Sequence, residues 1–159
     1  MNKVLITGGA GFVGTALIRK LIRKYKNIEI VSIDNYSSGH EHNHIKSKKV
    51  KYFYKDTQTL IPKKFDLNNT KMDYADAFEP DVVFHFGEFS RIVTSFDAFD
   101  NCWDYNMQGT KMVLDYCVAK KAKLIYSASS SKFGNDGKDE NLSPYAWMKA
   151  KMVELINNY

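Results

Sequence analysis

The sequence has 159 residues, of which 44% are hydrophobic, and a formal net charge of +5 at pH 7. This length suits one domain with a sizeable core. No apolar run approaches a membrane span and no cleavable signal pattern opens the chain, so neither membrane insertion nor secretion is expected. The charge lies in short Lys-rich stretches without a recognition element, so nucleic-acid binding is not expected. Cys102 and Cys117 have no metal-ligand spacing, which favours a reducing, cytoplasmic location.

A buried strand is predicted over Lys3–Thr7, and it leads into a glycine-rich turn. Residues 7–14 read Thr-Gly-Gly-Ala-Gly-Phe-Val-Gly, and apolar residues at helical spacing then run from Phe12 to Ile22. Glycines between a strand and a helix permit a tight turn, close approach to a pyrophosphate and close helix packing. The N–H groups and the dipole of the helix start then face the phosphates. A glycine-rich turn without a ligand is the alternative.

A second strand is predicted over residues 29–34, and it ends in an acid. Asp34 lies 20 residues beyond Gly14, the spacing expected for a carboxylate that accepts hydrogen bonds from an adenosine ribose. The same charge would repel a 2′-phosphate, which favours NAD over NADP. An Asp that merely starts the following turn, residues 35–39, is the alternative.

The rest of the chain alternates between strands and helices. Such alternation predicts an α/β fold with a Rossmann-type, doubly wound parallel sheet in the order 3-2-1-4-5, three layers deep, with ligand at the carboxyl ends of the strands. All of residues 1–159 are expected to form one dinucleotide-binding domain. The predicted elements are strands at 50–54, 81–86 and 123–127, a short helix near 72–78, a long helix over about 98–119, and a last helix that starts near Pro144 after a Gly134–Lys138 loop.

Tyr145 and Lys149 are four residues apart on the last predicted helix and therefore share a face. A phenol has an ordinary pKa near ~10, too high for a base at neutral pH. A nearby ammonium and an oxidised nicotinamide would both lower that pKa. Lys149 could also hold the nicotinamide ribose, and Ser129, just past the fifth strand, could bond the same substrate hydroxyl. The spacing alone occurs by chance; after a dinucleotide turn it favours catalysis.

These motifs together resemble the extended short-chain dehydrogenase/reductases, and among them the NAD-dependent nucleotide-sugar epimerases and dehydratases. The resemblance covers essentially all 159 residues. It is specific for the family and weakly specific for the substrate. It is carried by Thr7–Gly14, Asp34-Asn35, Asp56-Thr57, His85-Phe86-Gly87, Asn106–Thr110, Ser127–Gly134, and Ser143–Tyr145 with Lys149.

The resemblance implies a role for each of these positions in binding NAD or in catalysis. The catalytic set would be Ser129, Tyr145 and Lys149, the last two also touching the cofactor. The cofactor residues would be Gly8, Gly11, Phe12 and Val13 at the pyrophosphate, Asp34 and Asn35 at the adenosine ribose, Asp56 and Thr57 at the adenine, Phe86, Gly87 and Glu88 in the inner pocket, and Asn106 as its brace.

Three departures from the family pattern affect the expected function. Glu88 stands where the family has small residues, and its role is open. Ser130 and Ser131 replace the Asp-Glu pair with which dehydratases eliminate water, so epimerase-type oxidation–reduction fits better. The sequence stops at Tyr159, without the family's C-terminal substrate lobe, so the chain is expected to be a fragment, a truncated gene product or half of a split enzyme.

The expected function is that of an NAD-dependent nucleotide-sugar epimerase-type oxidoreductase, as in a 4-epimerase. A nucleotide-sugar would be its substrate if the missing lobe is supplied. A homodimer is expected through the long helix and the Tyr145 helix, as the resemblance implies. The alternatives are a nucleotide-sugar decarboxylase or reductase with the same first step, and a non-catalytic dinucleotide-binding module.

Two smaller features are not expected to form functional sites. Three alternating histidines follow Asp34, but no Cys or carboxylate cluster completes a site, so no metal is predicted. Aromatic residues crowd the start of the long helix, and core packing is the preferred interpretation. The histidines are His40, His42 and His44, and the aromatics are Phe96, Phe99, Trp103 and Tyr105.

Overall fold

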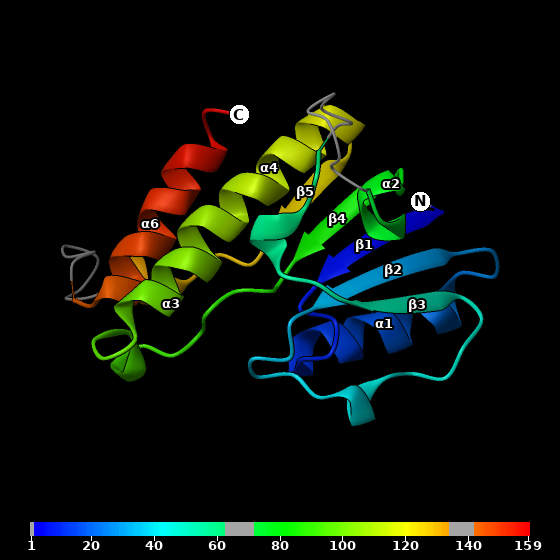
Figure 1. Cartoon of the computed structure of the whole chain (residues 1–159), viewed down its shortest axis with the longest axis horizontal. Coiled ribbons are helices and arrows are strands. Elements are labelled where there is room, and N and C mark those ends of the chain that lie inside the picture. Colours follow the sequence, from blue (N-terminus) through cyan, green and yellow to red (C-terminus); the bar gives the residue numbers. More distant parts are fainter. Residues whose placement is uncertain (1, 63–71, 134–141) are drawn as a thin grey trace.

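The structure, a computed structural model, describes residues 2–62, 72–133 and 142–159. Within these residues five parallel strands form one sheet in the order β3-β2-β1-β4-β5 (Figure 1). The predicted doubly wound α/β fold and its strand order are therefore confirmed. The strands are β1 (Lys3–Thr7), β2 (Glu29–Asp34), β3 (Val50–Tyr54), β4 (Val82–His85) and β5 (Lys123–Tyr126).

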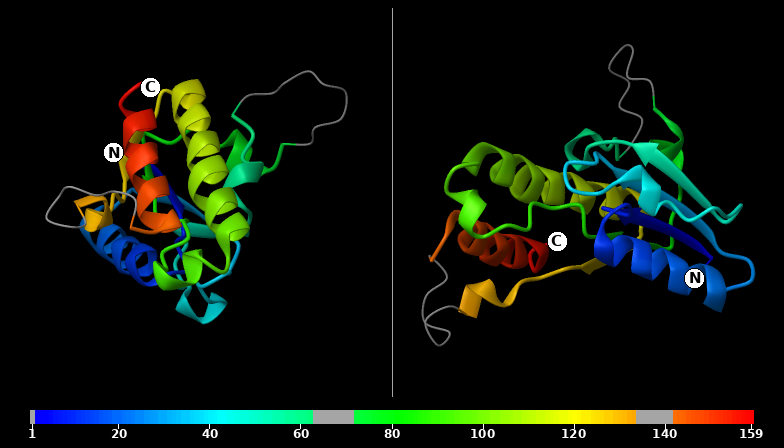
Figure 2. Two further views of the ribbon diagram at one scale, coloured as in Figure 1. Left: turned by 90° about the vertical axis from the view of Figure 1, so that its left-hand side faces the viewer. Right: turned by 90° about the horizontal axis from the view of Figure 1, so that it is seen from below.

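Helices cover both faces of this sheet, which makes three layers (Figures 1 and 2). Helix α1 (Phe12–Lys24) covers one face, and α2 (Tyr74–Ala77) and α4 (Gly109–Lys120) cover the other. Helix α6 (Pro144–Ile156) runs beside α3 (Phe99–Trp103) and the turn that follows it. The predicted Gly134–Lys138 loop lies outside the described residues.

Strand β1 is the centre of the core, since its apolar side chains alternate between the two faces. Ile6 packs under α1 against Ile18, while Leu5 packs on the other face with Val113 and Tyr116. All of these side chains are fully buried. A strand buried on both faces reads as an unbroken apolar run, which explains why the sequence predicts this element well.

The predicted long helix over about 98–119 is interrupted in the structure. Between α3 and α4 lies a π-helical turn, Asp104–Gln108. Such turns frequently occur at functional sites, and this one carries the buried Asn106. Its side-chain amide accepts from the Phe89 N–H at 2.7 Å and donates to the Phe89 carbonyl at 3.1 Å. The π-turn therefore places Asn106 to brace the segment that follows β4.

We expect Tyr116→Phe to lower the free energy of unfolding by about 1–3 kcal/mol, measured by urea denaturation. The buried Tyr116 hydroxyl lies 2.9 Å from the Ala75 carbonyl and 2.7 Å from the Phe78 carbonyl, and so ties α2 to α4. The matched control is Tyr159→Phe, because the Tyr159 hydroxyl donates to Asp115 at the surface. Equal losses in both variants would contradict this role.

Candidate active site

A cleft lies at the carboxyl ends of the strands, where the strand order reverses between β1 and β4. Ligands of open α/β sheets bind at such switch points. The cleft is built by the β1–α1 turn, the ends of β2 and β3, and the segment after β4. It is lined by Gly8, Gly11, Phe12, Val13, Gly14, Ile33, Asp34, Asn35, Ser37, Ser38, Gly39, Lys55, Thr57, Phe86, Gly87, Glu88, Ser90, Tyr105 and Ser127.

Two glycines of the β1–α1 turn are required by close backbone contacts. Gly8 has a φ of +71°, and a Cβ there would lie 2.7 Å from the main chain of Phe86 and Gly87. A Cβ on Gly14 would lie 2.3 Å from the Gly8 carbonyl oxygen. At Gly11, by contrast, a Cβ would meet only that oxygen, at 3.3 Å. The turn is thus held tight by Gly8 and Gly14, while Gly11 faces the cleft.

The start of α1 offers unpaired N–H groups to the cleft. Gly11 is the N-cap, no described side chain caps the helix, and its first turn holds no acidic residue. The first N–H groups of a helix have no partner within it, and they carry the positive end of its dipole. Phe12 is 92% exposed, so the approach is open. This arrangement suits a phosphate group.

Asp34 is held at the end of β2 by two main-chain hydrogen bonds. Its carboxylate oxygens accept from the N–H groups of Ala10 and Tyr36, both at 2.9 Å. Each oxygen keeps a further lone pair for a ribose hydroxyl. Asn35 donates to the Asp56 carboxylate at 2.7 Å. The adenosine half of NAD stays the prediction for this end of the cleft, where Asp34 is held in a fixed position.

The loop that follows Asp34 also lines the cleft, which the sequence does not predict. Ser37, Ser38 and Gly39 line the cleft because the loop folds back over the β1–α1 turn. Asn43 pins it by donating to the Ala10 carbonyl at 2.8 Å. The available signal in the sequence is the Ser- and Gly-rich stretch directly after Asp34, which by itself predicts only a turn.

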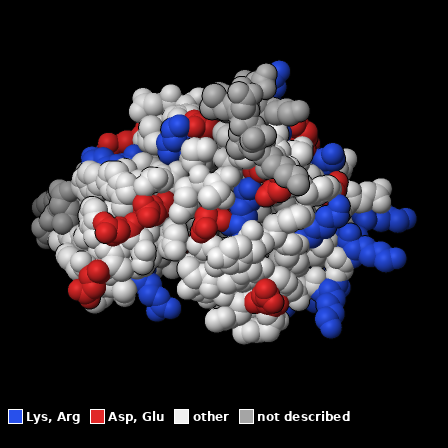
Figure 3. All heavy atoms as spheres, viewed as in Figure 1, with Lys and Arg blue, Asp and Glu red and all other residues white. Residues whose placement is uncertain are grey.

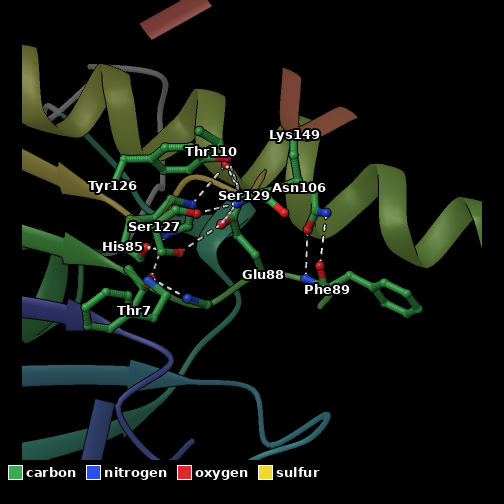
Figure 4. Close-up of polar contacts among 12 residues, drawn as sticks. Thr7, His85, Glu88, Phe89, Asn106, Thr110, Tyr126, Ser127, Ser129 and Lys149 are labelled. Carbon is green, nitrogen blue, oxygen red and sulfur yellow. Dashed lines mark hydrogen bonds and ion pairs between the residues drawn. The ribbon is translucent and has the colours of Figure 1, made fainter. Parts of the chain in front are cut away.

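At the inner end of the cleft, Glu88 and Lys149 form a buried ion pair (Figure 4). The Lys149 Nζ lies 2.5 Å from a Glu88 carboxylate oxygen, and the two side chains are 3% and 4% exposed. The same ammonium donates to the Ser127 carbonyl at 2.7 Å and lies 4.2 Å from the centre of the Tyr126 ring. The sequence leaves the role of Glu88 open, and the structure shows that its carboxylate neutralises the Lys149 ammonium.

Further hydrogen bonds converge on the Glu88 carboxylate. Tyr126 donates its hydroxyl at 2.9 Å and Thr110 donates at 3.2 Å. The Thr110 hydroxyl lies 2.9 Å from Nε2 of His85. The Thr110 hydroxyl donates its only hydrogen to Glu88, so it must accept in its contact with His85. Nε2 of His85 therefore carries a proton and donates it to Thr110.

The other ring nitrogen of His85 is an acceptor. Its Nδ1 lies 2.6 Å from the Thr7 hydroxyl, which itself accepts from the N–H groups of Phe86 and Gly87. The single Thr7 hydrogen is therefore directed at Nδ1, and the ring is neutral. Complete burial agrees, because it lowers the pKa of His85 to about 4.

We expect His85 to make stability pH-dependent between its unfolded pKa of about 6.5 and its folded pKa of about 4. In that window the unfolded chain binds a proton that the folded chain rejects, so the free energy of unfolding falls as pH falls, by up to about 1.4 kcal/mol per unit. Urea denaturation at pH 7.5 and pH 5 measures this slope. His85→Gln should flatten it; an unchanged slope in that variant would contradict the assignment.

Ser129 is close enough to Tyr145 to lower the pKa of its phenol, but the pKa is raised overall, against the predicted catalytic role. Burial raises the pKa of the Tyr145 phenol, the Ser129 hydrogen bond lowers it, and the Glu88 charge raises it further. The net direction is upward. The expectation that Lys149 would lower this pKa is therefore wrong here, because the positive charge of Lys149 is paired with Glu88.

Most of the predicted cofactor residues line the cleft in the structure, and the others lie outside its lining. Asn106 reaches the site through Phe89, as a brace would. Lining the cleft are Gly8, Gly11, Phe12, Val13, Asp34, Asn35, Thr57, Phe86, Gly87 and Glu88, whereas Asp56, Asn106, Ser129, Tyr145 and Lys149 do not line it.

Neither the surface charge nor the candidate metal ligands indicate a second functional site among the described residues. On the face shown in Figure 3, Lys and Arg gather on the right-hand side, toward the amino ends of the strands and away from the cleft. Within residues 2–62, 72–133 and 142–159, no group of three or more His, Cys, Asp or Glu side chains could hold a metal ion. His44 instead stacks on Tyr52 and hydrogen-bonds Tyr36.

No helix in the described part of the chain is long and apolar enough to cross a membrane. The two cysteines, Cys102 and Cys117, are both free and buried. Burial raises the pKa of Cys102 to about 11 and that of Cys117 to about 12, so both thiols stay protonated at neutral pH.

The strand order, the glycine turn and the acid at the end of β2 define a Rossmann-type dinucleotide-binding domain. A sequence model of the NAD dependent epimerase/dehydratase family matches residues 4–159. The chain belongs to this family. Its NAD dependence agrees with the cofactor predicted from Asp34.

Known relatives are similar over the whole chain. It is 27% identical to a dTDP-D-glucose 4,6-dehydratase of Dictyostelium discoideum over 100% of its length, and 28% identical to an ADP-L-glycero-D-manno-heptose-6-epimerase of Brachyspira hyodysenteriae over 97%. The matches cover 40% and 48% of those proteins. The chain thus spans about half the length, or less, of these curated relatives.

Solved structures share the fold. The epimerase Mth375 of Methanothermobacter thermautotrophicus matches with a TM-score of 0.81 and 26% identity, over 99% of this chain and 47% of that one. The UDP-glucose 4-epimerase of Brucella ovis in complex with NAD matches with a TM-score of 0.78 and 21% identity, over 100% of this chain and 48% of that one.

Proposed function

We propose that residues 1–159 form the NAD-binding and proton-transferring part of a nucleotide-sugar epimerase-type oxidoreductase. The observation that carries the proposal is the continuity of the site. The cleft begins at the start of α1 and at Asp34, and it ends at Glu88 and Ser127. Tyr145, whose pKa is lowered by Ser129, lies within electrostatic reach of Glu88 at that inner end.

Each residue of this site has a definite task. NAD, when bound, supplies a hydride acceptor that can later return the hydride. Gly11 and the first turn of α1 would hold its pyrophosphate, and Asp34 its adenosine ribose. The Tyr145 oxygen would take the proton of a sugar hydroxyl that the Ser129 hydroxyl orients. After the transient sugar ketone has been reduced on its other face, Tyr145 would return the proton to the new alkoxide.

Epimerisation is preferred to the related reactions. Ser130 and Ser131 offer no acid for the loss of water, and Ser131 is engaged with Ser129 at 2.8 Å. A decarboxylase or reductase would share the first oxidation, and the chain is 28% identical to a UDP-N-acetyl-alpha-D-glucosaminuronate decarboxylase of Bacillus cytotoxicus over 84% of its length. Products distinguish these reactions.

The test incubates the protein with NAD and a panel of UDP-, GDP- and dTDP-sugars. The sugars are then separated by anion-exchange chromatography, and nicotinamide absorbance is followed in parallel. An epimerised sugar without net reduction of NAD is the expected product. Release of carbon dioxide, or stoichiometric reduction or oxidation of the nicotinamide, would point to the decarboxylase or reductase instead.

Tyr145→Phe should lower turnover by about 10²–10⁴-fold, because it removes the group that transfers the proton. NAD affinity, measured by calorimetry, should be unchanged. The matched control is Tyr54→Phe, since Tyr54 is 74% exposed on β3. Turnover that survives in Tyr145→Phe would remove the phenol from the mechanism.

A specific observation favours a second candidate, a non-catalytic dinucleotide-binding module or half of a split enzyme. The Lys149 ammonium is held by Glu88 and Ser127, and the phenol of Tyr145 has a raised pKa. A protein of this kind would bind NAD in calorimetry and convert none of the sugars in the panel.

We also propose a cytoplasmic homodimer formed through the predicted long helix, which the structure divides into α3 and α4, and through α6. Support comes from two aromatic side chains that were expected in the core. Phe96 and Phe99 are instead 61% and 45% exposed, which corrects that expectation, and they lie next to Trp147 of α6. Size-exclusion chromatography with light scattering tests the dimer, and a monomer at micromolar concentration would contradict it.

A further inference from the structure

We propose that Glu88 is a positioning residue that captures the Lys149 ammonium and withholds its positive charge from the phenol of Tyr145. The capture itself can be observed in the free protein. Its consequence for chemistry rests on the proposed function, in which Tyr145 is the proton acceptor.

The first argument concerns the donors of Lys149. An ammonium has three N–H groups. In the structure this ammonium contacts the Glu88 carboxylate at 2.5 Å, the Ser127 carbonyl at 2.7 Å and the face of the Tyr126 ring. Two of the three donors are thus used in hydrogen bonds and the ammonium faces the Tyr126 ring, whereas Tyr145, one helical turn away, is not among these partners.

The second argument concerns how firmly Glu88 is held. Its carboxylate accepts from Tyr126 and Thr110 as well as from Lys149. Thr110 is itself oriented by His85, and His85 by Thr7 (Figure 4). Every hydrogen along this path points toward Glu88. The carboxylate therefore cannot release Lys149 by turning without also losing two other hydrogen bonds in a buried site.

The third argument is the balance of charge around the phenol. The titratable groups that act on it are Glu88 after β4, Cys102 on α3 and Tyr126 on β5, with His85 and the Lys149 ammonium of α6 in contact with or close to Glu88. Burial raises the pKa values of Tyr126 and Cys102, so both are uncharged at neutral pH, and His85 is neutral. Glu88 and Lys149 remain, and their charges oppose each other. The phenol consequently keeps its proton in the free protein, and the proposed proton transfer requires the positive nicotinamide of bound NAD to lower its pKa.

The experiment reads the ionisation of the phenol directly. Tyr145 is replaced by 3-fluorotyrosine, whose phenol ionises at lower pH than that of tyrosine, and its ¹⁹F resonance is followed against pH. Glu88→Gln keeps the shape of the side chain and removes its charge. We expect the titration midpoint to fall by about 1 pH unit or more, because the ammonium is then uncompensated.

Two controls separate charge from loosened packing. In the double variant Glu88→Gln with Lys149→Met, both charges are gone, and the midpoint should return toward that of the parent protein. Glu79→Gln, which breaks the exposed pair of Glu79 with Lys120, should leave the midpoint unchanged. An unchanged or raised midpoint in Glu88→Gln, or an equal fall in the double variant, would overturn the proposal.

A reciprocal variant covers the case in which Glu88→Gln does not fold. Lys149→Met leaves the Glu88 charge uncompensated, so the midpoint should rise by about 1 pH unit; no rise would overturn the proposal. None of these titrations needs turnover. If no sugar is converted but the titration midpoints shift as expected, only the proposed function is rejected. If a sugar is epimerised but the midpoints do not shift, only the capture of Lys149 by Glu88 is rejected.

Discussion

Lys149→Met should lower the free energy of unfolding by about 3–5 kcal/mol, because it leaves the Glu88 carboxylate buried without its cation. The side chains of the pair are 3% and 4% exposed, so solvent cannot replace the lost partner. Urea denaturation at pH 7 measures the loss. This is the largest effect on stability that we expect from any single ion pair among the described residues.

Two comparisons give this result its meaning. Adding Glu88→Gln to Lys149→Met should recover part of the loss, because neither charge then remains buried. Lys111→Met breaks the surface pair with Asp115, in which the lysine side chain is 52% exposed, and should cost no more than about 1 kcal/mol. A loss at Lys149 as small as that at Lys111 would show that Glu88 is solvated rather than buried.

Gly8→Ala should abolish measurable NAD binding and also lower stability by about 1–3 kcal/mol. The φ of +71° strains any residue with a Cβ, and the added carbon would lie 2.7 Å from the main chain of Phe86 and Gly87. Relief requires the β1–α1 turn to move away from β4, and both segments line the cleft. Calorimetric titration with NAD and thermal unfolding measure the two effects.

Gly11→Ala is the matched control for Gly8→Ala. Its added Cβ would meet only the Gly8 carbonyl oxygen, at 3.3 Å, and its φ of −79° is ordinary for alanine. It should cost less than about 1 kcal/mol in stability. If both variants were equally destabilised, the close approach of the β1–α1 turn to the β4 segment would not be the cause.

Features that depend on neighbouring residues could be predicted from the sequence. The bounds predicted for β1, β2 and β3 are those of the structure, because each strand is rich in β-branched or aromatic residues and is bounded by turn residues. Helix α6 begins at Pro144 as predicted, since Ser143 caps it by accepting from the Ala146 N–H. The bounds of these elements are determined by residues adjacent to them in the sequence, such as helix caps and turn residues.

Features that depend on distant residues could not be predicted. Glu88 and Lys149 are 61 positions apart, and nothing in either neighbourhood indicates that they meet. The i, i+4 spacing of Tyr145 and Lys149 gives them a shared helix face, but it does not say which partner the ammonium takes. The π-turn Asp104–Gln108 is equally hidden, because one extra residue in a turn leaves the apolar pattern of a helix almost unchanged.

The buried pair changes how the family pattern applies to this chain. The glycine turn and Asp34 have the geometry of a dinucleotide site, and Ser129 is close enough to Tyr145 to affect its pKa. Lys149 is also present, but its charge is balanced by the buried Glu88 carboxylate. The identity of the residue after Gly87 therefore matters as much to the proposed chemistry as the catalytic set itself.

A crystal structure of the protein with NAD tests the central claim most directly. We expect the pyrophosphate against the N–H groups at the start of α1, the adenosine ribose on Asp34, and the nicotinamide ring at the Glu88 end of the cleft next to Tyr145. NAD bound elsewhere, or a nicotinamide ring directed away from Tyr145, would contradict the account.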